Sequence, residues 1–147
     1  QSCFLKENYS IINGMPPEVN LLNEKNNGEN VLKLIQADLI LSVHDVSNGG
    51  LIVALSEMSM PSNYGVKIQK PKKLSNLYEY FFGEDQGRYI LEIDTNKLAK
   101  TEKILKDNNI YFENIGCTQK DYFEIEGELK TNVKDLFKIN NEWYNKY

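Results

Sequence analysis

The segment from residue 39 to residue 61 constrains the fold of this 147-residue chain more than any other. It opens with the short apolar run Leu39–Val43, which is typical of a strand that is covered on both faces. A polar stretch that ends in two glycines, His44–Gly50, comes next. The following apolar residues recur at helical spacing and stop near Pro61: Leu51, Ala54, Leu55 and Met58. A strand that turns directly into a helix predicts a mixed α/β domain.

The remaining segments alternate between helical and strand patterns in the same way. Apolar periodicity predicts helices over residues 18–37, 77–81, 98–108 and 136–143, with Ser75 as the cap of the second. Strands are expected over residues 66–68 and 88–94, and a hairpin over 111–117 and 122–126 with its turn at 118–121. We expect a loop over residues 6–17, because Asn13-Gly14 signals a turn and Pro16-Pro17 disfavours a helix.

Length and charge limit the classes of protein to which the chain can belong. A chain of 147 residues has the size of one ordinary domain with a single core. Its net charge of −4 and its pI of about 5.1 argue against binding along a nucleic-acid backbone. No apolar run approaches the ~20 residues of a membrane-spanning helix. We therefore expect no nucleic acid and no membrane among its partners.

The two cysteines, Cys3 and Cys117, lie far apart in the sequence and form no CxxC pair. They fit free thiols in a reducing cytoplasm better than a disulfide framework, and Cys117 is expected to be buried in its strand. Because the chain has a single histidine and no paired Cys/His spacing, a structural zinc site is not expected. Four neighbouring aromatic residues are expected in the core: Tyr78, Tyr80, Phe81 and Phe82.

The junction between the first strand and its helix is the strongest candidate for a binding site. Gly49 and Gly50 let the backbone approach a ligand, and the free N–H groups of the first helical turn suit a phosphate. Asp45, at the end of the strand, could hold Mg²⁺ against that phosphate. The alternative, which the residues alone favour, is that the glycines only open the helix and Asp45 caps the turn. The junction is neither a P-loop nor a GxGxxG fingerprint.

Two further features carry both a chemical and a structural interpretation. His44 is the only imidazole and could serve as a general base, but no motif places a nucleophile beside it, so a hydrogen-bonded structural role is favoured. The loop Glu84–Gln86 holds two carboxylates and an amide just before a strand, and it could grip a polar substrate or a metal. Its alternative interpretation is a solvated acidic turn between glycines.

Taken together, two motifs resemble the last domain of the synthetase subunit of the phosphoribosylformylglycinamidine synthase family. The first runs from His44 to Leu51 and reads HDVSNGGL, and the second runs from Phe82 to Tyr89 and reads FGEDQGRY. Weaker matches support them at Gln1-Ser2 with Leu5, at Pro16–Val19 and at Ile115-Gly116. The acidic second motif is similar to the small, separate-subunit type of the family. Asn48 departs from the family, which usually has an aspartate there.

The resemblance implies an ATP-dependent C–N ligase of purine biosynthesis. In that family ATP activates the amide oxygen of formylglycinamide ribonucleotide, and ammonia then displaces phosphate to form the amidine. The ammonia comes from glutamine through a separate glutaminase subunit and a small bridging subunit. The implied fold is α+β, a three-layer α/β/α structure with a mixed sheet, as in the C-terminal domain of aminoimidazole ribonucleotide synthetase-related proteins. Residues 1–147 would be that single domain, a fragment of a longer cytoplasmic subunit whose upstream domains are its partners.

The resemblance also assigns roles to individual residues. The family's catalytic histidine, nucleotide lysine and most Mg²⁺ ligands lie in upstream domains, so no catalytic residue is expected here and the fragment alone should be inactive. In the first of the family's two domain copies, the motif aspartate binds Mg²⁺ and the Glu-x-Gln loop binds the ribonucleotide. Those positions correspond here to Asp45, Glu84 and Gln86, and Gly49 and Gly50 complete the set. Here they would face an auxiliary site that holds a second, structural nucleotide, with ATP and Mg²⁺ not bound tightly by the fragment.

Two alternatives remain open beside this assignment. The chain could be a non-catalytic module that binds a nucleotide or acts as a scaffold for partner domains. It could also belong to a related kinase of selenide or thiamine phosphate, but the Gly83–Arg88 sequence counts against that group. If an upstream domain is missing, an exposed apolar patch larger than a few hundred Å² is expected where it would pack.

Overall fold

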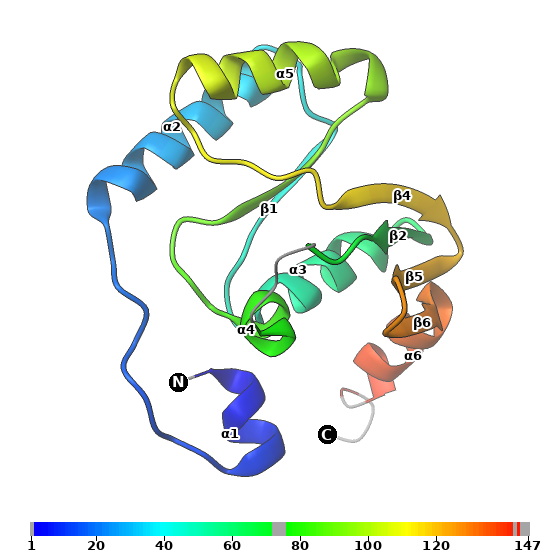
Figure 1. The fold of residues 1–147 in the computed structure, drawn as a ribbon. Coiled ribbons are helices and arrows are strands. Elements are labelled where there is room, and N and C mark those ends of the chain that lie inside the picture. Colours follow the sequence, from blue (N-terminus) through cyan, green and yellow to red (C-terminus); the bar gives the residue numbers. More distant parts are fainter. Residues whose placement is uncertain (1, 72–75, 143, 145–147) are drawn as a thin grey trace.

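Six helices and six strands follow one another along the part of the chain that this computed structural model describes, residues 2–71, 76–142 and 144 (Figure 1). The helices are α1 (Cys3–Tyr9), α2 (Leu21–Gln36), α3 (Gly50–Ser59), α4 (Leu77–Phe82), α5 (Thr95–Asp107) and α6 (Val133–Glu142). The strands are β1 (Ser42–Asp45), β2 (Tyr64–Ile68), β3 (Tyr89–Glu92), β4 (Gly116–Lys120), β5 (Tyr122–Ile125) and β6 (Leu129–Asn132). The predicted residues Gln1, Ser75 and Trp143 lie outside the described part.

The strands form two separate sheets. β1 and β3 make an antiparallel pair in which Ser42 lies opposite Glu92 and Asp45 lies opposite Tyr89. The other four strands have the order β4-β2-β5-β6, with β2 antiparallel to β4 and parallel to β5. β6 is antiparallel to β5. The predicted α+β fold with a mixed sheet is thus confirmed, and the mixed sheet is the four-stranded one.

Helices cover both faces of the β1–β3 pair. Ile90 of β3 packs in the larger core cluster with residues of α3 and α4, such as Leu55 and Phe81. Its neighbour Leu91 packs on the opposite side, against Leu34 of α2 and Leu105 of α5. Because successive side chains of a strand point to opposite faces, this pair of strands lies between two helical layers, as Figure 1 shows. The three-layer α/β/α arrangement is therefore present around β1 and β3.

The four-stranded sheet buries one face and leaves the other polar. Ile68 of β2 and Phe123 of β5 face α3 and α6 in the larger core cluster. On the opposite face, Glu124 accepts from the Lys130 ammonium at 3.2 Å and lies 3.9 Å from Lys67 Nζ. The hydrogen bond from Lys130 holds the pKa of Glu124 below its ordinary value. Cys117 lies opposite Lys67 on this polar face and is exposed, so the prediction of a buried Cys117 is wrong.

The N-terminal segment and the first strand differ from the prediction. The expected loop over residues 6–17 begins only after Tyr9, because α1 occupies residues 3–9 and the Phe4 ring stacks on the Phe82 ring at 4.1 Å. The strand expected over residues 39–43 is shifted to residues 42–45. It is not covered on both faces along its length, since the Val43 side chain is 37% exposed and no residue of the strand is fully buried.

The predicted hairpin is also wrong. β4 and β5 follow each other closely in sequence, but β2 lies between them in the sheet. The parallel register places Ile68 beside Ile125, and both side chains are buried in the larger core cluster. β6 carried no recognised strand pattern. Of the aromatic residues expected in the core, Phe81 is buried, whereas the Tyr78 side chain is 59% exposed.

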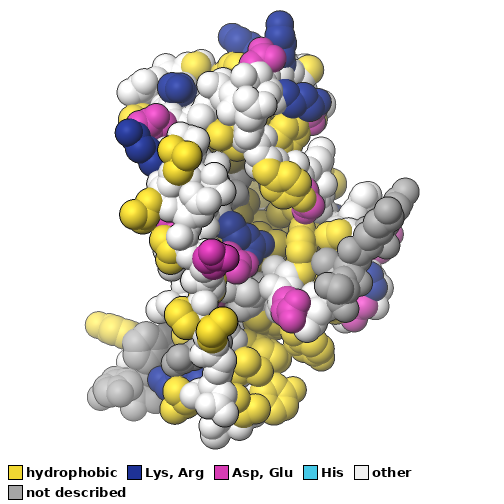
Figure 2. Space-filling view, turned by 60° about the vertical axis from the view of Figure 1, so that its left-hand side comes forward, with side chains coloured by type: hydrophobic (Ala, Val, Ile, Leu, Met, Phe, Trp, Pro, Cys, Tyr) yellow, Lys and Arg dark blue, Asp and Glu magenta, His cyan; other side chains and the backbone are white. Residues whose placement is uncertain are grey.

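Large exposed apolar side chains are concentrated in the connection from α1 to α2 and the first turn of α2: Ile11, Ile12, Met15, Val19, Leu21 and Leu22. Figure 1 shows this connection as an extended segment that runs outside the sheets. In the face drawn in Figure 2, hydrophobic side chains lie above and below a central group of acidic and basic side chains. None of the described helices is long and apolar enough to span a membrane.

Two glycine substitutions test the packing with opposite expected signs. A Cβ at Gly65 of β2 would clash with the Tyr122 carbonyl oxygen, so Gly65→Ala should lower the free energy of unfolding by about 1–3 kcal/mol. A Cβ at Gly28, inside α2, would meet Tyr89 Oη at an ordinary 3.4 Å. Gly28→Ala should therefore raise the free energy of unfolding by about 0.5–1 kcal/mol. Urea denaturation measures both, and a Gly65→Ala variant as stable as wild type would contradict the close approach of β2 to Tyr122 of β5.

Candidate functional site

The two motifs singled out in the sequence meet at one pocket of about 370 Å³. β1 ends at Asp45 and β3 begins opposite it at Tyr89, so antiparallel pairing brings the turn after β1 beside the loop before β3. The Val46 N–H donates to the Arg88 carbonyl at 2.9 Å and extends this contact by one residue. The pocket is lined by Pro17, Glu24, Asp45, Val46, Ser47, Asn48, Glu84, Gln86, Gly87, Arg88 and Tyr89.

Three of the five predicted binding residues line the pocket. They are Asp45, Glu84 and Gln86, and the Gln86 side chain is exposed. Gly49 and Gly50 are not among the residues of the described wall. Gly50 has a packing role: with φ of +75°, a Cβ there would lie 2.7 Å from the Phe82 carbonyl carbon, because the start of α3 touches the end of α4. The predicted part of both glycines in ligand binding stays a prediction.

The Glu84 carboxylate ties the pocket to the start of α3. Glu84 Oε1 accepts the Gly49 N–H at 2.8 Å and the Cys3 N–H at 2.9 Å. Partial burial by itself would raise the pKa of Glu84, but these two hydrogen bonds outweigh it and hold the pKa below its ordinary value. The Glu84 carboxylate is therefore hydrogen-bonded to the Gly49 N–H at the start of α3. This is the position at which the sequence predicts a ligand phosphate.

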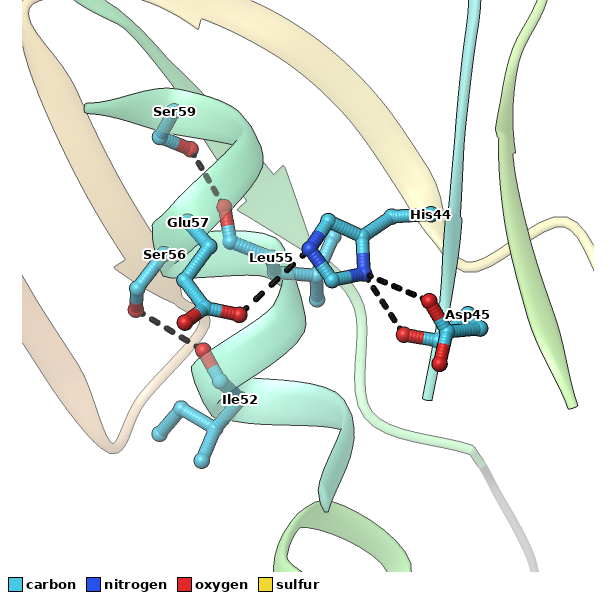
Figure 3. A network of polar contacts seen from close by, with 7 residues as sticks. All are labelled: His44, Asp45, Ile52, Leu55, Ser56, Glu57 and Ser59. Atoms are coloured by element: carbon cyan, nitrogen blue, oxygen red, sulfur yellow. Dashed lines mark hydrogen bonds and ion pairs between the residues drawn. The ribbon is translucent and has the colours of Figure 1, made fainter. Parts of the chain in front are cut away.

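His44 has a structural role between β1 and α3 (Figure 3). Its Nδ1–H donates to the Asp45 carbonyl oxygen at 2.6 Å, and its Nε2 lies 3.4 Å from Glu57 Oε2 of α3. In Figure 3 the imidazole lies between these two residues, so the ring links the end of the strand to the helix. The hydrogen-bonded interpretation of His44 is the one that fits these contacts.

The residues present fit Mg²⁺ only in a limited way. The Asp45 side chain is 68% exposed, and its Oδ1 lies 3.7 Å from His44 Nδ1. Among the described residues, no group of three or more His, Cys, Asp or Glu side chains could hold a metal ion. Mg²⁺ commonly keeps several waters and binds one or two carboxylates together with substrate phosphates. Asp45 therefore fits as a single protein ligand to an ion that also carries a phosphate group.

Two charged residues of the pocket wall, Glu24 and Arg88, were not among the predicted site residues. Glu24 of α2 lines the wall, and its Oε1 is buried without a hydrogen-bond partner among the described residues. Gly87 packs directly on Glu24, since a Cβ at Gly87 would lie 2.9 Å from Glu24 Cγ. Arg88 also lines the wall and donates to Asp85 Oδ2 at 3.2 Å. No local signal in the sequence links Glu24 to the second motif, because their proximity depends on how α2 packs.

The pocket wall combines carboxylates, amides and one guanidinium. The wall holds three carboxylates, those of Glu24, Asp45 and Glu84, and one guanidinium, that of Arg88. It therefore offers mainly hydrogen-bond acceptors. Such a wall suits ligand groups that donate hydrogen bonds, and a phosphate whose charge is offset by a metal ion.

A Glu84→Gln substitution tests the charge at this junction. Because the folded pKa of Glu84 lies below the ordinary 4.5, the carboxylate stabilises the fold fully above that pH. This stabilisation is lost as the pH falls through the lowered value. Urea denaturation at several pH values should show wild type more stable than Glu84→Gln near neutrality, with the difference shrinking below pH 4.5. An exposed control, Glu18→Gln, corrects for net charge; a difference unchanged down to acidic pH would contradict the assignment.

The chain is similar over its whole length to known synthetase subunits. It is 45% identical over 147 residues to the phosphoribosylformylglycinamidine synthase subunit PurL of Pelagibacter ubique. It is 35% identical over 150 residues to the same subunit of Bartonella bacilliformis. Each alignment covers 100% of this chain and 20% of the relative, so the chain spans about a fifth of the length of these curated relatives.

The fold is shared with solved structures from Thermotoga maritima, and a family model agrees. PurLQS superposes with a TM-score of 0.70 at 17% identity, covering 90% of this chain and 24% of that one. PurL in complex with FGAR superposes with a TM-score of 0.66 at 18% identity, covering 78% and 21%. Residues 3–126 match the family model described as AIR synthase related protein, C-terminal domain. The chain therefore belongs to this family.

Proposed function

We propose that this chain is the C-terminal domain of a longer phosphoribosylformylglycinamidine synthetase subunit. The complete subunit would use ATP to activate the amide oxygen of formylglycinamide ribonucleotide. Ammonia would then displace phosphate and form formylglycinamidine ribonucleotide, ADP and phosphate. The 45% identity to a PurL subunit along the whole chain supports the assignment, and so does the fact that the chain spans only a fifth of that relative.

The convergence of the two sequence motifs on one pocket is the observation that carries the proposal. Asp45 of the first motif and Gln86 of the second line the same 370 Å³ cavity although they lie far apart in the sequence. An alternative in which both motifs are ordinary surface turns does not require them to meet. We therefore assign the pocket to binding of a nucleotide or ribonucleotide, with Gly49 and Gly50 at its edge shaping the turn.

Within this proposal each residue has a binding or supporting role, and none is catalytic. Asp45 is the residue that would hold Mg²⁺, which when bound offsets the charge of a ligand phosphate. Gln86 offers an amide to a polar ligand, and Glu84 holds the turn. Structures of Thermotoga maritima PurL with FGAR and with ATP support a nucleotide-binding subunit. Asn48 is uncharged, so the site offers a metal ion one negative charge fewer than it would with an aspartate at this position.

The proposed partners are the upstream domains of the same subunit, a glutaminase subunit and a small bridging subunit. The solved Thermotoga maritima assembly named PurLQS supports a multi-subunit enzyme. The exposed apolar side chains from Ile11 to Leu22 fit a chain that packs against further protein. The two free cysteines agree with a cytoplasmic location, which we propose for the complete enzyme.

A second candidate function is a non-catalytic module that binds a nucleotide by itself or acts as a scaffold. The 370 Å³ pocket favours it, because all the residues described in its lining come from this one chain. The two functions differ in what the isolated chain can do. A domain of the synthetase would depend on its neighbours, whereas an autonomous module would bind its ligand alone.

A chimera tests the synthetase assignment. Replacing the matching fifth of the Pelagibacter ubique subunit with this chain should leave ammonia-dependent amidine formation within about tenfold of the parent, a barrier change of about 1.4 kcal/mol. The same subunit with that fifth deleted serves as the inactive control. Activity is measured with formylglycinamide ribonucleotide, ATP, Mg²⁺ and ammonium. A chimera that folds, as judged by circular dichroism, but forms no amidine would contradict the proposal.

Calorimetry on the isolated chain separates the two candidates. We expect no detectable binding of ADP with Mg²⁺ and no turnover, because the carboxylates of the wall repel a phosphate and only Asp45 is proposed to hold Mg²⁺. A micromolar dissociation constant, about −8 kcal/mol, would instead favour the autonomous module. Inorganic phosphate at the same concentration is the matched control for binding of an anion alone.

A further inference from the structure

The short helix α1 is attached to the pocket through one carboxylate. The Cys3 N–H in the first turn of α1 donates to Glu84 Oε1 at 2.9 Å. The same oxygen accepts the Gly49 N–H at the start of α3 at 2.8 Å. Cys3 is 81 residues and Gly49 is 35 residues from Glu84 in the sequence. A single side-chain atom thus joins α1, the start of α3 and the loop before β3.

The remaining attachment of α1 is aromatic. The Phe4 ring stacks on Phe82 at 4.1 Å and on Tyr78 at 5.5 Å, both from α4. No residue of α1 is fully buried. Isolated helices shorter than about 12–15 residues are marginal in water, so a helix of 7 residues depends on its docking contacts. For α1 these contacts are the Phe4 ring and the Glu84 carboxylate.

We propose that Glu84 is a positioning residue that couples the docking of α1 to the conformation of the pocket. It acts as a built-in anion on the Gly49 N–H, where an external phosphate would otherwise be favoured. The coupling rests on the proposed function only in treating this pocket as the ligand site. Because linkage is reciprocal, any change that draws Glu84 away from Gly49 also removes the partner of the Cys3 N–H and loosens α1.

The coupling has a consequence for how a ligand is held. While α1 is docked, Glu84 keeps the Gly49 N–H occupied, so a ligand is bound by the other groups of the wall, such as Asp45 and Gln86. A ligand phosphate that takes the Gly49 N–H must displace Glu84 and release α1. Whether α1 is docked therefore determines which groups of the pocket bind the ligand.

The Cys3 thiol is a built-in reporter of this contact. Burial and then the nearby Glu84 carboxylate raise the pKa of Cys3. Removing the carboxylate therefore changes alkylation of Cys3 in two ways. Loss of the charge moves the midpoint of the rate against pH to lower pH, because the thiolate is the nucleophile. Release of α1 raises the plateau rate at high pH, because that plateau reports access to the thiol.

The first experiment measures iodoacetamide alkylation of Cys3 from pH 7 to 10.5. All variants carry Cys117→Ser, since the exposed Cys117 would otherwise react as well. We expect Glu84→Ala to lower the midpoint and to raise the plateau at least threefold. Phe4→Ala, which removes the aromatic attachment, should also raise the plateau and lower the midpoint, because release of α1 exposes the thiol and moves it away from Glu84. The matched control Asp85→Asn removes the neighbouring carboxylate and should change neither. A Glu84→Ala plateau equal to wild type would overturn the proposal.

The second experiment tests whether α1 and the pocket are coupled. Amide resonances of Asn48, Gly49 and Gln86 are compared in wild type, Phe4→Ala, Glu84→Ala and the double variant. The rings that contact Phe4 are those of Tyr9, Tyr78 and Phe82. A shift of the Gly49 amide in Phe4→Ala that disappears in the Glu84→Ala background therefore demonstrates coupling through the carboxylate. No shift, or the same shift in both backgrounds, would overturn it.

Neither experiment uses a nucleotide or measures turnover, so their outcome is independent of the proposed reaction. An inactive chimera together with a positive coupling result would refute the synthetase assignment and leave the role of Glu84 intact. An active chimera together with an unshifted Gly49 amide would refute the role of Glu84 alone.

Discussion

The antiparallel pairing of β1 with β3 is the constraint on which the described pocket depends. It places Asp45 opposite Tyr89 and so forces the turn after one strand and the loop before the other onto the same edge. Helices hold this pair from both sides, because Ile90 and Leu91 point into different core clusters. The pocket is therefore built on a strand pair that reaches both core clusters, and its two motifs cannot separate without loss of core packing.

Backbone donors at the start of α3 are satisfied from within the chain. A helix start attracts anions, and here the Glu84 carboxylate supplies one at the Gly49 N–H. Glycine is required beside it for another reason, since α3 approaches α4 too closely for a Cβ at Gly50. The motif that suggests a phosphate loop thus also performs a structural task. Its exposed members, Asp45 and Gln86, are the groups left to meet a ligand.

Sequence patterns predicted the elements whose signal is local. The helix over residues 18–37, the polar turn His44–Gly50 and the loop before β3 all lie close to where they were expected. The hairpin failed because neighbouring strands were assumed to pair, whereas burial of Ile68 against Ile125 places β2 between β4 and β5. α1 was missed because a helix of this length carries too little periodicity, and it is held by rings from a distant segment.

By itself, the sequence determined the residue types of the site and the family resemblance, because both reside in two contiguous motifs. It also determined the α+β class, because alternating helical and strand periodicity is a local property. Only the tertiary structure decided that Glu24 and Arg88 share a wall with Asp45 and that Cys117 is exposed. It alone assigned Glu84 to the start of α3. These outcomes depend on contacts between segments remote in sequence, and such contacts are selected by the burial of the whole core.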